Sequence, residues 1–293
     1  MVAETSQRTT PLELVQDIVS PLLKQPAPAT QPAMGFFTDT SICIGCKACE
    51  VACKQWNELP AENAQWSGTS YDNTRQLSAT TWRHVQFIEQ IGREPPQVST
   101  LPFLNNDRWL MHSDVCKHCA NAPCQEACPT GAIIHTEFDT VYVQQDICNG
   151  CGYCVVACPF GVIARDEQGS HTARKCTLCY DRMKDGLEPA CAKACPTDSI
   201  QYGEVEQLKA QARERLGLLH ERGVSEARLY GVDDNILDGD LNSFFLLLDE
   251  PAVYNLPHNP SRPSNNVIPA SWWSIATALV LSLLGIFFFS NNK

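Results

Sequence analysis

The residues of this chain with the richest chemistry are its sixteen cysteines, spread over 293 residues. They fall into four groups of four, and each group begins with a C-x2-C pair and ends with two cysteines separated by three residues. Thiolates spaced this closely are metal ligands or disulfide partners. The sequence therefore predicts one kind of site, built repeatedly. The groups are Cys43, Cys46, Cys49 and Cys53; Cys116, Cys119, Cys124 and Cys128; Cys148, Cys151, Cys154 and Cys158; and Cys176, Cys179, Cys191 and Cys195.

The third group has the most specific spacing, C-x2-C-x2-C-x3-C-P, which is typical of bacterial ferredoxins. In such a run three thiolates on a tight loop hold one cubane, and the fourth ligates a different cluster. The first group keeps this spacing but has Lys54 in place of the proline, while the second and fourth groups have longer middle gaps. The repeat predicts four [4Fe-4S] clusters on sixteen thiolates.

Zinc and disulfides are the alternative uses of these cysteines. Two pairs separated by a longer loop would suit a structural zinc site, and the fourth group alone fits that pattern. The third group does not, because its four cysteines lie within eleven residues. Tight, like groups are also poorly placed to link distant segments by disulfides. A zinc-rich, membrane-anchored scaffold is thus the alternative from a non-redox class.

The cross-ligation rule predicts which cysteines share a cluster. The second and third groups are separated by nineteen residues and should form an inner ferredoxin unit, leaving the first and fourth to form an outer one. The four expected ligand sets are Cys43, Cys46, Cys49 and Cys195 (site A); Cys53, Cys176, Cys179 and Cys191 (site B); Cys116, Cys119, Cys124 and Cys158 (site C); and Cys128, Cys148, Cys151 and Cys154 (site D).

The expected fold is α+β, with two nested ferredoxin-like units of two clusters each and a C-terminal transmembrane helix. Hairpins are expected from the alternating segments 132–137 with 141–146 and 162–166 with 171–175; strands at 82–92 and 244–251; and an exposed amphipathic helix at 205–223. The predicted boundaries are an extension at 1–34, an outer unit at 35–100 and 165–204, an inner unit at 101–164, a helix and strand region at 205–254, an extended linker at 255–270 and an anchor at 271–289.

The two ends of the chain differ in character. Residues 12–23 could form an amphipathic helix, which would dock on a partner or pack on its own domain, and residues 25–33 read as a linker. No secretory signal is recognisable at the start. Residues 271–289 carry no charge and would span about 28 Å as a helix, close to the thickness of a bilayer core. Trp272 and Trp273 suit one membrane interface, and the flanking charges leave the orientation open.

The remaining composition excludes some functions. A formal net charge of -11 argues against nucleic acid as a partner. Nothing resembles a nucleophile or an acid–base pair, so no catalytic residue is expected. The scattered histidines are expected to be surface or structural residues: His84, His112, His118, His135 and His171. The tryptophans are expected to be core or subunit-interface residues rather than redox relays: Trp56, Trp66, Trp82 and Trp109.

The four motifs together resemble a known family. The segments GFFTDTSICIGCKACEVACKQWNELP, CKHCANAPCQEACPTGAI, CNGCGYCVVACPFGVI and KCTLCYDRMKDGLEPACAKACP are similar to the iron–sulfur subunits of membrane-bound molybdopterin oxidoreductases. GDLNSFFLLLDEPAVYNLP and the single anchor resemble the β subunit of formate dehydrogenase in particular. Related nitrate reductase subunits replace one ligand with tryptophan, whereas all sixteen positions here are cysteine.

The resemblance implies a non-catalytic electron-transfer subunit carrying four [4Fe-4S] clusters. A molybdenum or tungsten pterin subunit would oxidise formate, and a membrane cytochrome b or quinone-reactive subunit would accept the electrons. The implied location is the inner membrane, with the globular part leaning to the periplasmic side. The alternative is the equivalent subunit of a hydrogenase or of a polysulfide or dimethyl sulfoxide reductase. The extension of about 34 residues departs from the family pattern.

Overall fold

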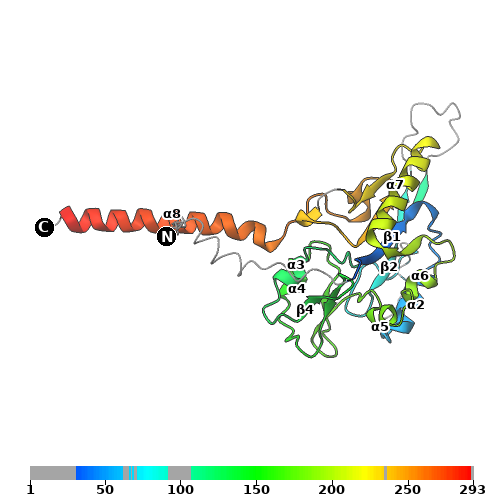
Figure 1. Ribbon diagram of the computed structural model, residues 1–293, viewed down its shortest axis with the longest axis horizontal. Coiled ribbons are helices and arrows are strands. Elements are labelled where there is room, and N and C mark those ends of the chain that lie inside the picture. The colour runs from blue at the N-terminus through cyan, green and yellow to red at the C-terminus, as the bar shows by residue number, and fades with distance from the viewer. Residues whose placement is uncertain are drawn as a thin grey trace, which may run out of the picture.

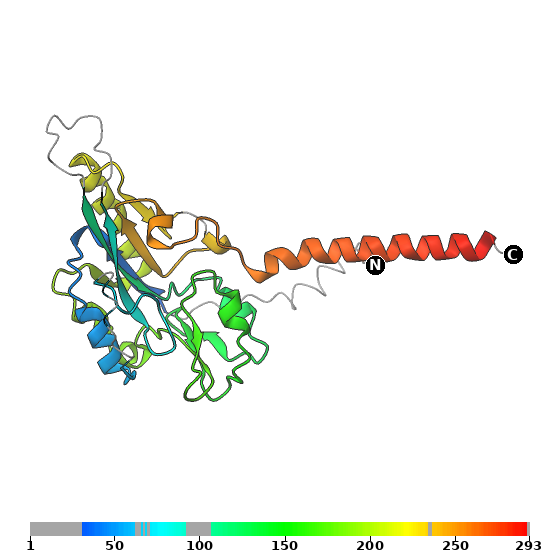
Figure 2. The same ribbon diagram turned by 180° about the vertical axis from the view of Figure 1, so that it is seen from behind.

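The structure is a computed structural model in which a body of small sheets and short helices carries one long C-terminal helix (Figure 1). The helix leaves the body on one side, and the view from behind shows the same arrangement (Figure 2). The predicted helix at 12–23 lies outside the described residues. Those residues are 31–61, 66, 68, 71–91, 107–233 and 236–291.

The largest sheet has the strand order β8-β1-β10-β9. Its central pair joins the two ends of the globular body, because β1 (Met34–Asp39) runs parallel to β10 (Ser243–Leu247). The edge strands β8 (Ile200–Glu204) and β9 (Arg228–Tyr230) are antiparallel to their neighbours. The strand predicted at 244–251 is thus confirmed, with an earlier end.

Both faces of this sheet are covered, since successive side chains of a strand point to opposite faces. Phe37 and Phe244 stack at 5.8 Å between ring centroids and face α7 (Val205–Glu221). Phe36 and Phe245 belong to the other core, which contains most of the buried cysteines. This explains why β10 reads as a continuous apolar run rather than an alternating one.

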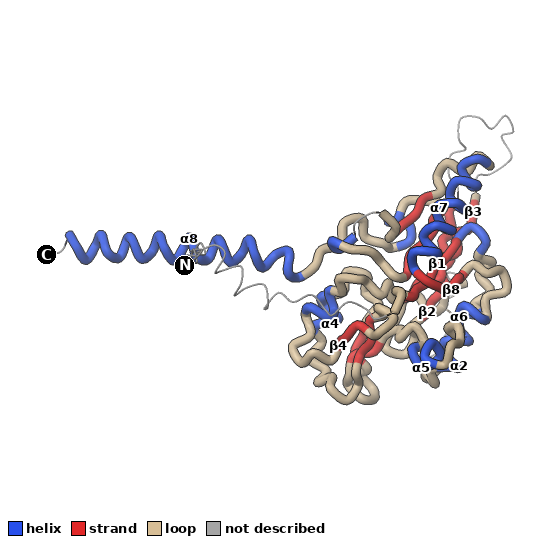
Figure 3. The backbone as a smooth tube through the Cα atoms, viewed as in Figure 1, coloured by secondary structure: helices blue, strands red, loops and turns tan. Residues whose placement is uncertain are grey.

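The helix predicted at 205–223 is confirmed as α7, which covers the outer face of the sheet (Figure 3). Val205, Leu208 and Ala212 are buried on its inner side, while the other side is polar and exposed. The helix ends at Glu221, and Gly223 follows with a φ of +85°. A left-handed residue there closes the last turn at little cost only if it is glycine.

Three hairpins support the loops that carry the cysteines. The two predicted ones are confirmed in shorter form, as β4 (Ile133–His135) with β5 (Val141–Val143) and β6 (Ala164–Arg165) with β7 (Ala173–Arg174). The strand predicted at 82–92 is confirmed as β2 (Arg83–Gln90). Its partner β3 (Arg108–Val115) was missed, because RWLMHSDV mixes charged and polar residues into a strand that is mostly buried at its end.

Short helices follow the cysteine loops, and they pack in two pairs. α2 (Ala48–Trp56) packs on α6 (Ala190–Lys193), and α3 (Pro123–Glu126) packs on α4 (Tyr153–Ala157). Another short helix, α5 (Tyr180–Lys184), contacts α2, because Trp56 reaches Asp181 and Arg182. Each pair therefore joins helices from two different cysteine groups. Three 3-10 turns, η1 (Thr40–Ile42), η2 (Ile236–Asp238) and η3 (Pro251–Tyr254), complete the body.

The C-terminal helix α8 runs over Pro263–Asn291 and corrects the expected linker. An extended linker was predicted to reach residue 270, but the backbone is helical from Pro263, because proline is well accommodated in the first turn of a helix. The span Pro263–Ser290 has a mean hydropathy of 2.0, and its most apolar window has no residue buried against the body. By length and composition α8 is a candidate membrane span that includes the predicted anchor at 271–289.

Candidate metal centres

Site A is a cavity between the first cysteine loop and the turn after α6. Its lining includes Cys43, Cys46, Cys49 and Cys195, together with Val85, Ser113 and Ile200. The loop returns on itself at Lys47, which has a φ of +60° and starts α2. Cys195 arrives from the far end of the sequence because β8, which follows it, pairs with β1, which precedes Cys43. All four cysteines of the first predicted set thus line one cavity.

Site B is formed where α2 packs on α6. Cys53 lies on α2, Cys191 on α6, and Cys179 is the residue that starts α5. Burial raises the pKa of the Cys53 thiol, and the next three contributions come from Cys176, Cys191 and Cys179. These are the three partners that the second predicted set gives to Cys53.

Site C is a buried cavity at the α3–α4 pair. Its lining includes Cys116, Cys119, Cys124 and Cys158, with Lys117, Lys175 and Phe160 beside them. The third predicted set therefore surrounds one space, although Cys158 comes from the following group. Pro159 belongs to the same lining and turns the backbone away after the fourth cysteine.

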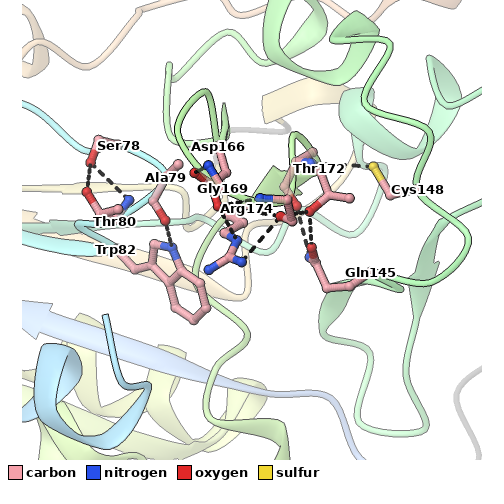
Figure 4. Close-up of polar contacts among 12 residues, drawn as sticks. Ser78, Ala79, Thr80, Trp82, Gln145, Cys148, Asp166, Gly169, Thr172 and Arg174 are labelled. Atoms are coloured by element: carbon pink, nitrogen blue, oxygen red, sulfur yellow. Dashed lines mark hydrogen bonds and ion pairs between the residues drawn. The ribbon is translucent and has the colours of Figure 1, made fainter. Parts of the chain in front are cut away.

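Site D lies on the other side of α4, and its lining includes Cys128, Cys148, Cys151 and Cys154. The β6–β7 hairpin holds the loop of the third group in place. The backbone N–H of Ala173 donates to Cys148 Sγ at 3.4 Å, and the Thr172 hydroxyl donates to Gln145 Oε1 (Figure 4). Gly150 has a φ of +70°, and a Cβ there would lie 2.3 Å from the carbonyl oxygen of His171. Only glycine lets this loop approach the hairpin so closely.

The cysteines fit polynuclear clusters better than single ions. All sixteen are free of disulfides. In the described part of the protein, no three His, Cys, Asp or Glu side chains close on one point as a single metal ion requires. The cavities of sites A, C and D are each lined by all four cysteines of one predicted set. Similar cavities with four cysteines each suit one kind of occupant, a cubane with four thiolate ligands.

Polar hydrogens already point at several of the sulfur atoms. The backbone N–H of Leu178 donates to Cys176 Sγ at 3.3 Å, and the Ser113 hydroxyl lies 3.4 Å from Cys49 Sγ. Such bonds stabilise negative charge on a thiolate and orient it toward a metal. Asn57 Nδ2 approaches Cys53 Sγ at 3.6 Å in the same way.

Burial favours the protonated form of many of these thiols. It raises the pKa of Cys49, Cys154 and Cys179 to about 11, with nearby cysteines adding to the effect. Cys128 is different: burial opposes ionisation, but hydrogen bonds from Thr130 and Ile133 lower its pKa below the ordinary value. Because only thiolates ligate iron, binding must release the protons that burial retains.

Buried cations near the sites were missed by the sequence reasoning. Arg83, Lys117 and Lys175 are all at most 2% exposed. Lys117 and Lys175 flank ligand cysteines in CKHC and KCTLC, which was an available signal. Arg83 lies thirty residues after the preceding cysteine, so its position in the sequence gave no such signal. All three face cysteine sites, but Lys117 also pairs with Asp114, whereas neither Arg83 nor Lys175 has a carboxylate partner in the described residues.

The histidines have structural surroundings. His118 accepts a hydrogen bond from the Val141 N–H at 3.1 Å through Nδ1, and burial keeps its pKa well below the ordinary value. His84 bonds Asp72, and His135 bonds Asp139, each at 2.7 Å. His112 lies edge-on to Phe245, with a ring-centroid separation of 4.6 Å.

The tryptophans divide between contacts within the body and exposure. Trp56 donates to Asp181 at 2.8 Å and stacks under the Arg182 guanidinium at 4.2 Å, which links α2 to α5. Trp82 donates to the Ala79 carbonyl at 2.9 Å (Figure 4). Trp66 and Trp109 are exposed.

Comparisons with known proteins also point to iron–sulfur clusters. Two family models described as a 4Fe-4S dicluster domain match residues 42–132 and 107–205. The formate dehydrogenase iron-sulfur subunit of Haemophilus influenzae is 41% identical over 229 residues, covering 76% of this chain and 68% of the relative. The formate dehydrogenase-O iron-sulfur subunit of Escherichia coli is 39% identical over 244 residues, covering 80% and 75%.

More distant similarity extends to a second group of reductases. The B subunit of the anaerobic dimethyl sulfoxide reductase of Escherichia coli is 31% identical over 183 residues, covering 60% of this chain and 75% of the relative. The formate dehydrogenase relatives are more similar and match over a longer part of the sequence. The cysteine repeat and these relatives together show an electron-transfer protein with [4Fe-4S] clusters, which belongs to the family of formate dehydrogenase iron–sulfur subunits.

Proposed function

We propose that this chain relays electrons from a formate-oxidising catalytic subunit to a membrane subunit, through clusters held by the ligand sets of sites A to D. The observation that carries the proposal is that cysteines from two different groups line each of three cavities. That exchange of ligands is how paired clusters are held in ferredoxin-type domains. A [4Fe-4S] cluster supplies one-electron transfer, and the thiolates and buried walls of the protein position it and limit its access to water.

The ligand sets make two nested units. Sites A and B share α2, and sites C and D share the α3–α4 pair. We assign residues 35–100 and 165–204 to the outer unit and 101–164 to the inner one. The pairing of β8 with β1 supports this assignment, because it joins the beginning of the outer unit to its end. Residues 205–254 then cover the outer unit through α7 and β10.

The order of the sites along the relay follows from the cysteines that face one another. Cys49 of site A has Cys191 of site B among its charged neighbours. Burial raises the pKa of Cys176 of site B most, and Cys116 of site C is the next group that raises it. Cys154 of site D adds to the raised pKa of Cys124 of site C, after burial and nearer groups. These neighbours support the linear order A, B, C, D.

The two ends of this order reach the surface. At site A, Cys46 is exposed, and Ile44 and Val51 are 60% and 62% exposed beside it. At site D, Cys151 is exposed, and Val156 of α4 is 89% exposed. Exposed apolar side chains beside a terminal cluster suit contacts with partner subunits. We therefore place one redox partner at each end.

The site D end belongs near the membrane. Arg262, directly before α8, pairs with Glu126 of α3 at 3.0 Å and with Asp238 at 3.1 Å. The Ser264 N–H also donates to Glu126 at 3.3 Å. These contacts fix the base of the candidate membrane helix against the inner unit, while α2 and α5 lie farther from it (Figures 1 and 2). Electrons from formate would enter at site A and leave at site D.

The proposed partners follow from the family. They are a catalytic subunit with molybdenum or tungsten on pterin cofactors at the site A end, and a cytochrome b or quinone-reactive subunit at the site D end. The proposed location is the inner membrane, with α8 as a single-pass anchor and the body on the periplasmic side. The similarity to the dimethyl sulfoxide reductase B subunit supports a second candidate, a subunit of a reductase in which electrons run from the membrane to the substrate.

The test is to purify the tagged protein from membranes without oxygen and to identify its partners and metals. Molybdenum or tungsten in a copurifying large subunit, with clusters that formate reduces within seconds, is the expected result. Clusters that are unaffected by formate but reoxidised by dimethyl sulfoxide would favour the second candidate. Nickel in the large subunit, with reduction by hydrogen, would contradict both.

A further inference from the structure

Two buried cations, Arg83 and Lys175, lie between neighbouring cysteine sites. Arg83 is 1% exposed and Lys175 is 2% exposed. A buried charge needs negative charge or several hydrogen-bond acceptors close by. Lys117, another cation buried beside the cysteine sites, has the carboxylate of Asp114 as its partner. Within the described residues, neither Arg83 nor Lys175 forms an ion pair with a carboxylate.

Arg83 lies between sites A and B. Its Nη1 donates to Ser113 Oγ at 3.0 Å, and that hydroxyl lies 3.4 Å from Cys49 Sγ of site A. Its Nε and Nη2 are buried and find no acceptor within the described residues. Burial lowers its pKa, but the charges of cysteines raise it above the ordinary value; in decreasing order these are Cys191, Cys49, Cys176 and Cys53. One of these four belongs to site A and three to site B.

Lys175 lies between sites B and C. Its Nζ donates to the carbonyl oxygens of Val141 and of Cys176, the latter at 2.9 Å. The same side chain lines the cavity of site C. Cys116 and Cys124 of site C and Cys176 of site B are its charged neighbours. Site B thus has a buried cation on each side.

We propose that Arg83 and Lys175 are potential-setting residues, with Arg83 acting on the clusters of sites A and B and Lys175 on those of sites B and C. A cluster gains one negative charge when it is reduced, and a fixed positive charge nearby in a poorly polarisable interior stabilises the reduced form. The inference rests on the ligand sets proposed above.

Site D serves as an internal comparison. The arginine in its lining, Arg165, has a side chain that is 42% exposed and paired with Glu167 at 2.8 Å. Solvent and this partner screen its charge. The cluster of site D should therefore respond to neither substitution.

The experiment is an EPR-monitored redox titration of the intact complex carrying Arg83→Met, Lys175→Met or both. Each single variant should lower the midpoint potentials of two clusters, with at least a tenfold loss in the equilibrium constant for reduction, which is about 59 mV for one electron. The double variant should shift the potentials of three clusters, and the potential of the cluster affected by both single variants should shift most.

Arg83→Lys should recover most of the shift in potential caused by Arg83→Met. Arg213→Met is the matched control, because it removes an exposed arginine of α7 that pairs with Asp233. It should shift no midpoint potential.

Four unmoved midpoints in a fully assembled variant would overturn the inference, as would an equal shift of all four. If Arg83→Met does not assemble, Arg83→Gln decides its half, because it removes the charge while its amide can still donate to Ser113 Oγ. We expect lowered potentials at sites A and B with full iron content, and unchanged potentials at both would refute the role of Arg83. Fewer than four titrating clusters in the unsubstituted complex would instead refute the proposed ligand sets.

Discussion

Cys49 and Cys53 lie one turn apart on α2 but face different cysteine sites. Cys49 lines the cavity of site A, whereas burial and then Cys176, Cys191 and Cys179 of site B raise the pKa of Cys53. Residues four apart on a helix share one face, and here that face lies along the boundary between the two sites. The helix α2 therefore places the two sites directly beside each other, as electron transfer between them requires.

This relationship predicts the effect of removing Cys195. Cys195→Ala should damage the cluster of site A, to which Cys43, Cys46 and Cys49 are also assigned. It should spare the cluster of site B, although Cys191 of site B is a close neighbour of Cys195 in the sequence. Double variants give the measurement, because changes within one site should not add, whereas changes in two sites should. Spin integration after reduction should find three intact cubanes in Cys195→Ala with Cys43→Ala.

The comparison variant is Cys195→Ala with Cys191→Ala, in which only two intact cubanes should remain. The reverse pattern, with two cubanes in the first double variant and three in the second, would mean that each group holds its own cluster. The exchange of ligands between groups would then be wrong.

Gly150 and Gly152 offer a matched pair for the loop of site D. Both have positive φ, +70° and +80°, so alanine at either costs about 1–2 kcal/mol of backbone strain. A Cβ at Gly152 meets nothing within 4 Å, but one at Gly150 would collide with the His171 carbonyl. Gly150→Ala should therefore cost about 1–3 kcal/mol more, by displacing the hairpin.

The measurement for this pair is the temperature at which cluster absorbance is lost in the purified complex. Gly150→Ala should lose it at a clearly lower temperature than Gly152→Ala, with the iron of site D released first. Equal midpoints for the two variants would show that the contact between the loop and the β6–β7 hairpin does not stabilise site D.

The candidate anchor can be tested apart from the partners. Residues 261–293 joined to a soluble reporter should carry it into the membrane fraction and resist extraction at high pH. Leu281→Arg, near the middle of the apolar stretch, should weaken insertion by about 2.5–3.5 kcal/mol, and Leu281→Ile should not. A reporter that stays soluble with the unsubstituted segment would contradict the membrane role of α8.

We expect Arg262 to orient α8 relative to the globular body rather than to affect insertion of α8 into the membrane. Arg262→Ala removes ion pairs to Glu126 and Asp238 that are partly exposed, so the expected stability loss is at most about 1 kcal/mol. The variant should stay in the membrane, and transfer of electrons from the reduced clusters to the membrane acceptor should slow. An unchanged rate in stopped-flow measurements would show that the contacts of Arg262 do not position site D near the membrane acceptor.

The cysteine spacing carries most of the site prediction because three of the four cysteines that line each of cavities A, C and D come from one local run. Cys148, Cys151 and Cys154 follow one another on one loop, and all three line site D. The crossing fourth ligand follows from the known geometry of ferredoxin runs, which is why Cys195 could be assigned to the first group across about 140 residues. Hairpins with alternating residues, such as 132–137 with 141–146, were likewise readable from local pattern.

What the sequence did not reveal depends on long-range burial. Strand β3 carries Ser113 and Asp114 into the interior, beside the cysteine sites. Polar residues are normally rare there, so the sequence pattern gave no sign that this segment is a buried strand. Arg83 looked like a surface residue for the same reason. The start of α8 at Pro263 was also missed, since prolines between 255 and 270 suggested a linker, although proline also begins helices.

The most direct test of the account is the iron and acid-labile sulfide content of this subunit, measured on the anaerobically purified complex together with an electron count. Four cubanes require about sixteen irons and sixteen sulfides beyond those of the partner subunits, and reduction should take up about four electrons per subunit. Zinc in place of iron, or about eight irons or fewer with about two electrons, would contradict the four-cluster relay.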